Sequence, residues 1–452
     1  MNHYKKGVRY FSPAAWILAA GGFSLFYSAF LGLMKQLNHS DVFGLNLYLG
    51  KASAISMAMA AALLTLSLAL HIKGGAEKQI EHRVKKRLYD PVYGNPLVLR
   101  EGELLPPVRC RRLNSITFEI SVMAVSCTVE NLLNIAPVIS SSLNGKLGKY
   151  AVVSCEADEA FNRVDYRIED VLADRSLTVD SVEGLRAPDK TKIPIDTETF
   201  IDLKTSGSIL IAGKTRSGKT TGTITILLPL LLCGRDKYDS NIFIIDPKLA
   251  ELSMLPNVVA VNPNGDVEPV IALMEEFEST RKTRQAVLNR RSQETGNAVK
   301  WWDAGMHPSI LFIDEYVTLK SLFPKSARGN GGFNISDFES LLKRIITMGA
   351  SAGCFVIISI AEASVEEGGL PSMLKSAMTT KILFKPTMEE ARLIWNSERL
   401  RTFNAGRAYG AGDCLFSSTD GIHDTPGYLH FPNMEFEVYA ELGRLLEEYY
   451  AS

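Results

Sequence analysis

The run from Ile209 to Thr221, Ile-Leu-Ile-Ala-Gly-Lys-Thr-Arg-Ser-Gly-Lys-Thr-Thr, constrains this chain more than any other segment. It joins an apolar stretch, predicted to be a strand, to a glycine-rich turn and then to an apolar helix over 224–232. The spacing G-x-x-x-x-G-K-[ST] is that of a phosphate-binding loop, whose glycines let backbone N–H groups wrap closely around phosphates. The N-terminus of the following helix adds positive potential. The run therefore predicts a nucleotide site.

Two side chains of this loop have specific expected roles. Lys219 should reach the β- and γ-phosphates, and the Thr220 hydroxyl should ligate Mg²⁺. We therefore predict ATP and Mg²⁺ as cofactors. The predicted nucleotide-binding residues of the loop are Gly213, Lys214, Thr215, Arg216, Ser217, Gly218, Lys219, Thr220 and Thr221.

A second acidic signature follows the apolar run Ile310–Ile313, which is predicted to be a buried strand. Asp314 is expected to bind Mg²⁺, and Glu315 to orient or polarise the attacking water. An acidic pair that only caps a helix is the alternative, but the phosphate loop upstream favours catalysis. We predict Lys219, Asp314 and Glu315 as catalytic residues, and Thr220 and Asp314 as metal ligands.

A less specific motif, Asp246-Pro247-Lys248, follows the predicted strand 241–245. We assign Asp246 and Lys248 to the nucleotide site. Because Pro247 forces a turn, a plain turn cap by Asp246 is the alternative.

From about residue 195, short apolar strands alternate with helices. Such alternation predicts a doubly wound, mostly parallel sheet. Nucleotide sites lie at the carboxyl ends of such strands, and the phosphate loop and both acidic motifs fall at those ends. The predicted strands lie at 209–212, 241–245, 309–313, 354–359 and 381–384, with a long charged helix at 270–291.

The preceding segment predicts a small α+β subdomain without a chemical motif of its own. Residues 90–107 are rich in Pro and Gly and are typical of a linker. The expected elements are strands at 115–125, 150–155 and 164–168 and a helix at 129–147 in which Pro137 is a weak point. We interpret this unit as a packing or assembly subdomain.

The chain begins with two uncharged apolar runs, each long enough to cross a bilayer. We predict spans at about 14–34 and 52–72. Lys and Arg gather before the first run and after the second, so the positive-inside rule places both termini in the cytoplasm and residues 35–51 outside. The alternatives are a cleaved signal peptide and a buried alanine-rich helix. The basic run 73–87 either touches anionic lipid or is a solvated helix face.

The composition of the 452-residue chain bears on nucleic-acid binding and on the state of its cysteines. The net charge of −1 provides no overall basic field for nucleic acid, so any such surface must be local. The six cysteines show no metal-binding spacing, and we expect reduced thiols.

Residues 195–435 resemble the motor domain of the FtsK/SpoIIIE/HerA DNA translocases. Residues 110–195 loosely resemble the subdomain that precedes that motor. The size, the two spans and the lack of a C-terminal winged helix look most like the coupling proteins of Gram-positive conjugative plasmids and integrative conjugative elements. The segments that carry the resemblance are 211–221, 245–248, 251–253, 313–316, 380–384 and 410–416.

The resemblance implies an α/β, RecA-like P-loop NTPase fold and a membrane-anchored, ATP-dependent DNA translocase acting as a conjugative coupling protein. It implies a homo-hexamer that hydrolyses ATP between subunits and threads DNA without sequence specificity. The other implied partners are a relaxase, conjugation channel proteins and the lipid bilayer.

The alternatives are a chromosome-partition translocase, a slowly hydrolysing docking platform for a relaxase and a protein-secretion motor. The implied domains are a membrane anchor (1–73), a basic juxtamembrane segment and linker (74–110), an assembly subdomain (111–194) and the motor (195–452).

The chain departs from the family pattern at two places. Ala350 stands where the family has a candidate trans-acting Arg, and 358–362 lacks the Gln that senses the γ-phosphate. Arg344 and Arg407 are candidate substitutes for the Arg.

Two segments are candidates for DNA contact. The loop 323–334 contains Lys325 and Arg328 and is either pore-lining or a surface loop. Trp301 and Trp302 either stack on bases or pack in the core.

Overall fold

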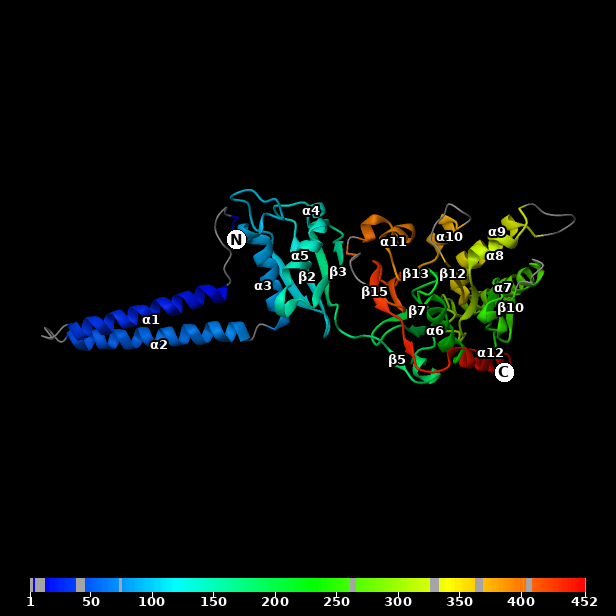
Figure 1. Cartoon of the computed structure of the whole chain (residues 1–452), viewed down its shortest axis with the longest axis horizontal. Helices are drawn as coiled ribbons and strands as arrows, with labels where there is room; N and C mark the ends of the chain where they lie inside the picture. Colours follow the sequence, from blue (N-terminus) through cyan, green and yellow to red (C-terminus); the bar gives the residue numbers. More distant parts are fainter. Residues whose placement is uncertain are drawn as a thin grey trace. The chain divides into compact units, whose positions relative to one another are not determined.

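The computed structural model describes residues 3–4, 13–37, 45–72, 75–260, 266–325, 333–361, 369–400, 402–403 and 409–451. The chain forms two compact units, Met1–Ala173 and Asp174–Ser452 (Figure 1). Residues 174–194, which the sequence analysis places in the smaller subdomain, belong to the second unit. Their apolar side chains pack into the core of that unit, among them Val179, Leu185 and Ile193.

The first unit begins with two long apolar helices, α1 (Pro13–Leu37) and α2 (Leu45–Ile72). They lie side by side and antiparallel (Figure 1), and serine hydroxyls join them. Ser24 and Ser56 donate to each other's main-chain carbonyls at 2.8 and 2.7 Å, and Ser28 and Ser53 do so at 2.9 and 3.0 Å. Both helices are long and apolar enough to cross a membrane.

The rest of the first unit is an antiparallel sheet with the strand order β1-β2-β4-β3, covered by helices. Its bounds are β1 Val108–Arg112, β2 Thr117–Met123, β3 Tyr150–Ala157 and β4 Arg163–Asp170, with helices α3 Ala76–Tyr89, α4 Val129–Asn134 and α5 Ala136–Ser142. The helix expected at 129–147 is broken because Pro137, which lacks an N–H, sits in the first turn of α5.

Helix α3 belongs to the core of this subdomain. Ile80, Val84 and Leu88 recur at helical spacing and are buried with residues of the sheet. Leu97 and Leu99, from the segment expected to be a linker, are buried in the same core. The basic residues of α3 therefore lie on a helix that is packed along one face.

The second unit is built on an eight-stranded sheet with the order β10-β9-β11-β12-β8-β13-β14-β15. The first six strands in this order are mutually parallel, and β14 and β15 extend the sheet antiparallel. The mostly parallel, doubly wound fold is thus confirmed. The strands are β8 Ile209–Ala212, β9 Ile242–Asp246, β10 Val258–Ala260, β11 Ser309–Ile313, β12 Cys354–Ile360, β13 Thr380–Phe384, β14 Asp413–Ser417 and β15 Gly427–His430.

Helices cover both faces of this sheet (Figure 1). One core packs under α6 and α12, and the other under the N-terminal part of α7 and α8–α11. Side chains of β8 alternate between the two cores, with Ile211 in the first and Leu210 in the second. The helices are α6 Lys219–Leu231, α7 Glu268–Thr295, α8 Tyr316–Leu322, α9 Ile335–Gly349, α10 Ser372–Ala377, α11 Met388–Ile394 and α12 Val438–Ala451. Short pairs β5 Thr178–Val179 with β16 Asn433–Met434, and β6 Lys192–Pro194 with β7 Phe200–Asp202, complete the unit.

Gly349, which ends α9, is required where the chain turns back toward β12. A Cβ at this position would lie 2.1 Å from the carbonyl oxygen of Cys354. We therefore expect Gly349→Ala to lower the free energy of unfolding by about 1–3 kcal/mol. Gly427→Ala is the control because nothing lies within 4 Å of its Cβ position, and it should change stability by less than about 0.5 kcal/mol. Equal effects in thermal or denaturant unfolding would contradict this.

Candidate active site

The phosphate loop connects the end of β8 to the start of α6, in the middle of the main sheet. Gly218 has φ +96° and lies just before Lys219, the first residue of α6. A Cβ at Gly218 would lie 2.8 Å from the backbone nitrogen of Gly412, so only glycine fits here. Lys214, Thr215, Arg216 and Thr221 are exposed, whereas Ser217 and Lys219 are buried.

The loop fits the group that the motif predicts. Gly213 has φ +152°, and a Cβ there would meet Ser217 Oγ at 2.8 Å. The Ser217 hydroxyl is buried and has no hydrogen-bond partner. Such an orphaned donor beside a helix N-terminus is suited to an anionic oxygen.

Glu315 is the centre of charge in the site. Its carboxylate Oε1 lies 2.8 Å from the Nζ of Lys219 and 2.9 Å from the Nζ of Lys248. Burial alone would raise the pKa of Glu315, but the hydrogen bonds from both lysines outweigh it and lower the pKa. Glu315 also has φ +47°, an uncommon conformation for a residue with a side chain. The structure thus holds an ionised carboxylate next to the phosphate-loop lysine.

Asp314 has a different environment from Glu315. Burial raises the pKa of Asp314, while Ser359 and Lys219 oppose the rise. The Ser359 hydroxyl beside it makes no hydrogen bond of regular geometry. The backbone N–H of Asp314 donates to the carbonyl of Ile245 at 2.9 Å, so β9 holds the end of β11 in place. A bound cation would favour the charged form of Asp314.

Asp246 organises the turn after β9. Its carboxylate accepts from the backbone N–H groups of Lys248, Ala250 and Ser253 at 2.9, 3.1 and 3.1 Å. These bonds correspond to the turn-cap role that the sequence left open. Through this turn, Asp246 holds the segment that carries Lys248, whose Nζ contacts Glu315. A direct role of Asp246 in nucleotide binding stays a prediction.

Among known proteins, residues 176–377 match the FtsK/SpoIIIE family. The DNA translocase FtsK of Campylobacter jejuni is 25% identical over 224 residues, 48% of this chain and 22% of that protein. The DNA translocase FtsK of Mesorhizobium japonicum is 24% identical over 368 residues, 73% of this chain and 37% of that protein. The chain thus spans well under half the length of these two relatives.

One solved structure is described as the pCW3 conjugation coupling protein TcpA, in a monomer form with ATPgS. It aligns with 82% of this chain and 99% of its own, at a TM-score of 0.47 and 13% identity. The ATPase EssC of Geobacillus thermodenitrificans aligns with 62% of this chain and 52% of its own, at a TM-score of 0.43 and 18% identity.

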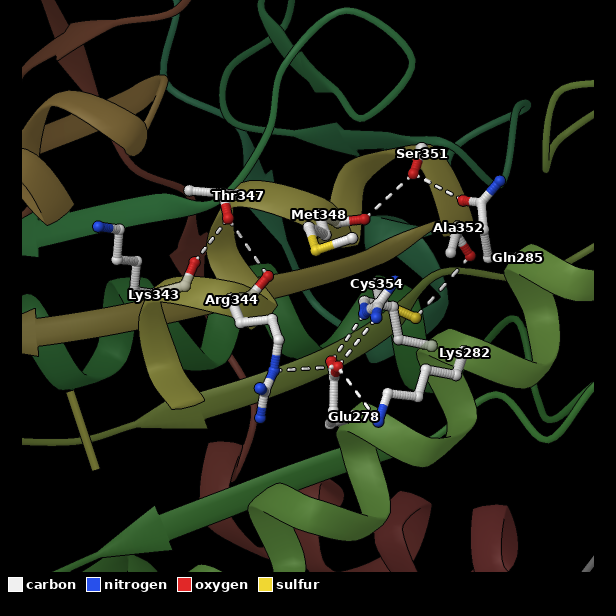
Figure 2. A network of polar contacts seen from close by, with 11 residues as sticks. Glu278, Lys282, Gln285, Lys343, Arg344, Thr347, Met348, Ser351, Ala352 and Cys354 are labelled. Carbon is white, nitrogen blue, oxygen red and sulfur yellow. Dashed lines mark hydrogen bonds and ion pairs between the residues drawn. The ribbon is translucent and has the colours of Figure 1, made fainter. Parts of the chain in front are cut away.

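Arg344, the candidate substitute for the Arg that the family pattern has at the position of Ala350, forms an ion pair with a neighbouring helix. Figure 2 shows it reaching from α9 toward Glu278 of α7, and its Nε lies 3.3 Å from Glu278 Oε1. Glu278 is buried and paired more closely with Arg281, at 2.7 Å. The Arg344 side chain remains 52% exposed. Ala350 is exposed where α9 ends, and Arg407 lies outside the described residues.

The structure describes the ends of the candidate DNA-contact loop 323–334 and both tryptophans. Phe323 is buried and stacks on Phe338 at 4.5 Å, and Asn334 caps α9. The ends of the loop are therefore anchored, Lys325 is exposed, and 326–332, including Arg328, lie outside the described residues. Trp301 is buried and packs on Phe355 at 5.9 Å, so this tryptophan is a core residue. Trp302 packs against the same core.

Two residues that we did not single out from the sequence support the phosphate loop, and a third lies beside Asp314. The backbone N–H of Gly412 donates to the carbonyl of Ser217 at 3.3 Å, and Lys385 Nζ donates to that of Arg216 at 3.2 Å. Ser359 lies beside Asp314. The segment 410–416 contributes to the resemblance, but its contact with the loop depends on long-range strand pairing that no local pattern indicates.

The charge on Glu315 should make stability depend on pH. The folded pKa lies below the ordinary 4.5, so this stabilisation is complete above pH 4.5 and is lost as the pH falls through the folded pKa. We expect the parent chain to lose more stability than Glu315→Gln on acidification. Melting temperatures of both from neutral pH to pH 3 check this, with exposed Glu435→Gln as control. A parent–variant difference independent of pH would contradict it.

Proposed function

We propose that this chain is an ATP-driven DNA translocase. The observation that carries the proposal is the ion pair of Lys219 with Glu315 at the carboxyl edge of a parallel sheet, within an FtsK/SpoIIIE domain. Lys219 would bind the β- and γ-phosphates, and Glu315 would orient the attacking water. Lys248 would keep Glu315 ionised when Lys219 turns to the phosphates.

ATP with Mg²⁺ is the proposed cofactor. The phosphate loop, residues 213–221, would hold the phosphates, and Thr220 and Asp314 would ligate the metal. Among the described residues, no group of three or more Asp, Glu, His or Cys side chains is arranged to hold a metal ion alone. A site with only two protein ligands suits Mg²⁺, which commonly uses one or two protein ligands together with phosphate oxygens and waters.

Anchoring in a lipid bilayer is the second part of the proposal. Large apolar side chains of α1 and α2 face outward, with Phe23 73% and Phe26 72% exposed. Hydrocarbon is a favourable surrounding for such side chains and water is not. The proposed topology has both termini in the cytoplasm.

A conjugative coupling role and a hexameric ring are the finer proposals. The two apolar helices before an FtsK/SpoIIIE domain support the first, with a relaxase and channel proteins as partners. In a ring, ATP would be hydrolysed between subunits. Arg344 is then the candidate trans-acting residue, because its guanidinium is pre-positioned by Glu278 and remains half exposed. A chromosome-partition translocase is the alternative within the same chemistry.

Two variants separate binding from hydrolysis. Lys219→Ala should abolish ATP binding and transfer, because it removes the phosphate-binding ammonium. Glu315→Gln should retain ATP binding but lower DNA-stimulated hydrolysis by about 10²–10⁴-fold. Equilibrium nucleotide binding, phosphate release and a transfer assay measure these effects, and protein levels are the control. Normal transfer by Lys219→Ala would refute the motor role.

A slowly hydrolysing docking platform is the competing function. Ala350 at the position of the family's Arg, and buried Ile360 at the end of β12, favour it, since neither side chain can donate a hydrogen bond to a γ-phosphate. ATP binding without DNA-stimulated hydrolysis by the purified parent chain would support this alternative over the motor.

The topology has its own test. A single cysteine introduced into the connection between α1 and α2 should react with a membrane-impermeant thiol reagent in intact cells. A cysteine near the C-terminus should react only after lysis. The native cysteines are replaced in both chains. The opposite pattern would overturn the proposed orientation.

A further inference from the structure

A cavity of about 370 Å³ lies in the second unit, away from the phosphate loop. Strands β8 and β13 run parallel. The phosphate loop follows β8 and therefore lies at the edge of the sheet where both strands have their carboxyl ends. The cavity is lined instead by Thr379 and Lys381 at the start of β13, and by Ser417 and Ser418 at the end of antiparallel β14. It therefore opens at the opposite edge of the sheet, with a volume in the range of small-molecule sites.

Two cations line this cavity, Lys381 and Arg399. Lys381 lies on the face of β13 that also carries buried Leu383, so part of its side chain is covered. Burial lowers the pKa of Lys381, and Arg399 and Lys375 lower it further. Among the described residues, no carboxylate forms an ion pair with Lys381. Asp424 also lines the cavity. Its main-chain carbonyl accepts a hydrogen bond from Arg399 at 3.2 Å.

Hydroxyl groups complete the lining. Lys381 and Ser417 are cross-strand partners, so their side chains project from the same face of the sheet. Ser417 Oγ accepts a hydrogen bond from Trp395 Nε1 at 2.8 Å, which leaves its own proton to donate. Ser418 contacts Thr380 through their hydroxyls, at 3.4 Å. Two cations with adjacent hydroxyl donors form a donor set for an oxyanion.

We propose that this cavity binds a phosphate group, with Lys381 and Arg399 as its cationic ligands and Ser417 as a hydroxyl donor. The phosphate belongs either to the DNA backbone or to a free phosphate or mononucleotide. Binding of a DNA phosphate rests on the proposed function, whereas binding of free phosphate or a mononucleotide does not. A phosphate held here would relieve the repulsion between the two cations and favour the charged form of Lys381.

The test uses the full chain and three probes: a fluorescent 20-nucleotide dT strand, inorganic phosphate and thymidine monophosphate. Each is titrated against the parent, Lys381→Gln, Arg399→Gln and Lys381→Arg. Arg392→Gln is the matched control, because Arg392 is exposed on α11 and does not line the cavity. Circular dichroism and affinity for an ATP analogue show that each variant is folded, and both should match the parent.

If DNA is the source, Lys381→Gln and Arg399→Gln each weaken oligonucleotide binding about tenfold, the size expected for a lost charge-assisted hydrogen bond. The slope of log affinity against log salt also falls by about 0.7 per cation removed. If the source is free phosphate, the same variants lose phosphate or mononucleotide binding and oligonucleotide affinity is unchanged. Lys381→Arg retains binding in either case.

Unchanged binding of all three probes by both Gln variants would overturn the proposal. An equal loss in Arg392→Gln would also overturn it, because the effect would then be one of general charge. The proposed function fails separately, if the folded parent binds neither the ATP analogue nor DNA. Loss confined to the cavity variants leaves nucleotide binding at the phosphate loop intact.

Discussion

The parallel ladders that β12 forms with β8 and with β11 are the constraint on which the site depends. Ile360 pairs with Ala212, the last residue before the phosphate loop, and Ile358 pairs with Ile313, the last residue before the acidic pair. Parallel pairing in this register brings two segments about one hundred positions apart to the same edge. All three strands are fully buried, so a slip would expose core residues.

The two acidic residues of the site are both buried but differ in the pKa that their surroundings give them. Glu315 is stabilised as a carboxylate by Lys219 and Lys248, whereas burial pushes Asp314 toward its neutral form. Neighbouring carboxyls with different affinities for a proton are a common basis for distinct roles in one site. The turn cap by Asp246 contributes indirectly, because it holds the loop that carries Lys248.

Much of the site was predictable because its motifs are local. The phosphate loop and the strand before Asp314 each have a short spacing with a direct physical meaning, and the central strands are near-continuous apolar runs. The antiparallel strand β15 and the support of the loop by Gly412 were not predictable, because both depend on distant pairing. Pro137 indicated the break in the helix expected at 129–147. No residue pattern indicated that the first unit ends at Ala173. Ser359 lies in an otherwise apolar strand, and nothing nearby in the sequence relates its hydroxyl to Asp314.

The reciprocal serine bonds between α1 and α2 have a mechanical consequence. Each hydroxyl donates to the main chain of the partner helix, so four bonds define one axial register. Sliding or rotating one helix would break them together, and in hydrocarbon no water would replace them. Polar contacts of this kind are individually weak, on the order of 0.6 kcal/mol. Because all four must break at once, together they would oppose sliding of one helix along the other.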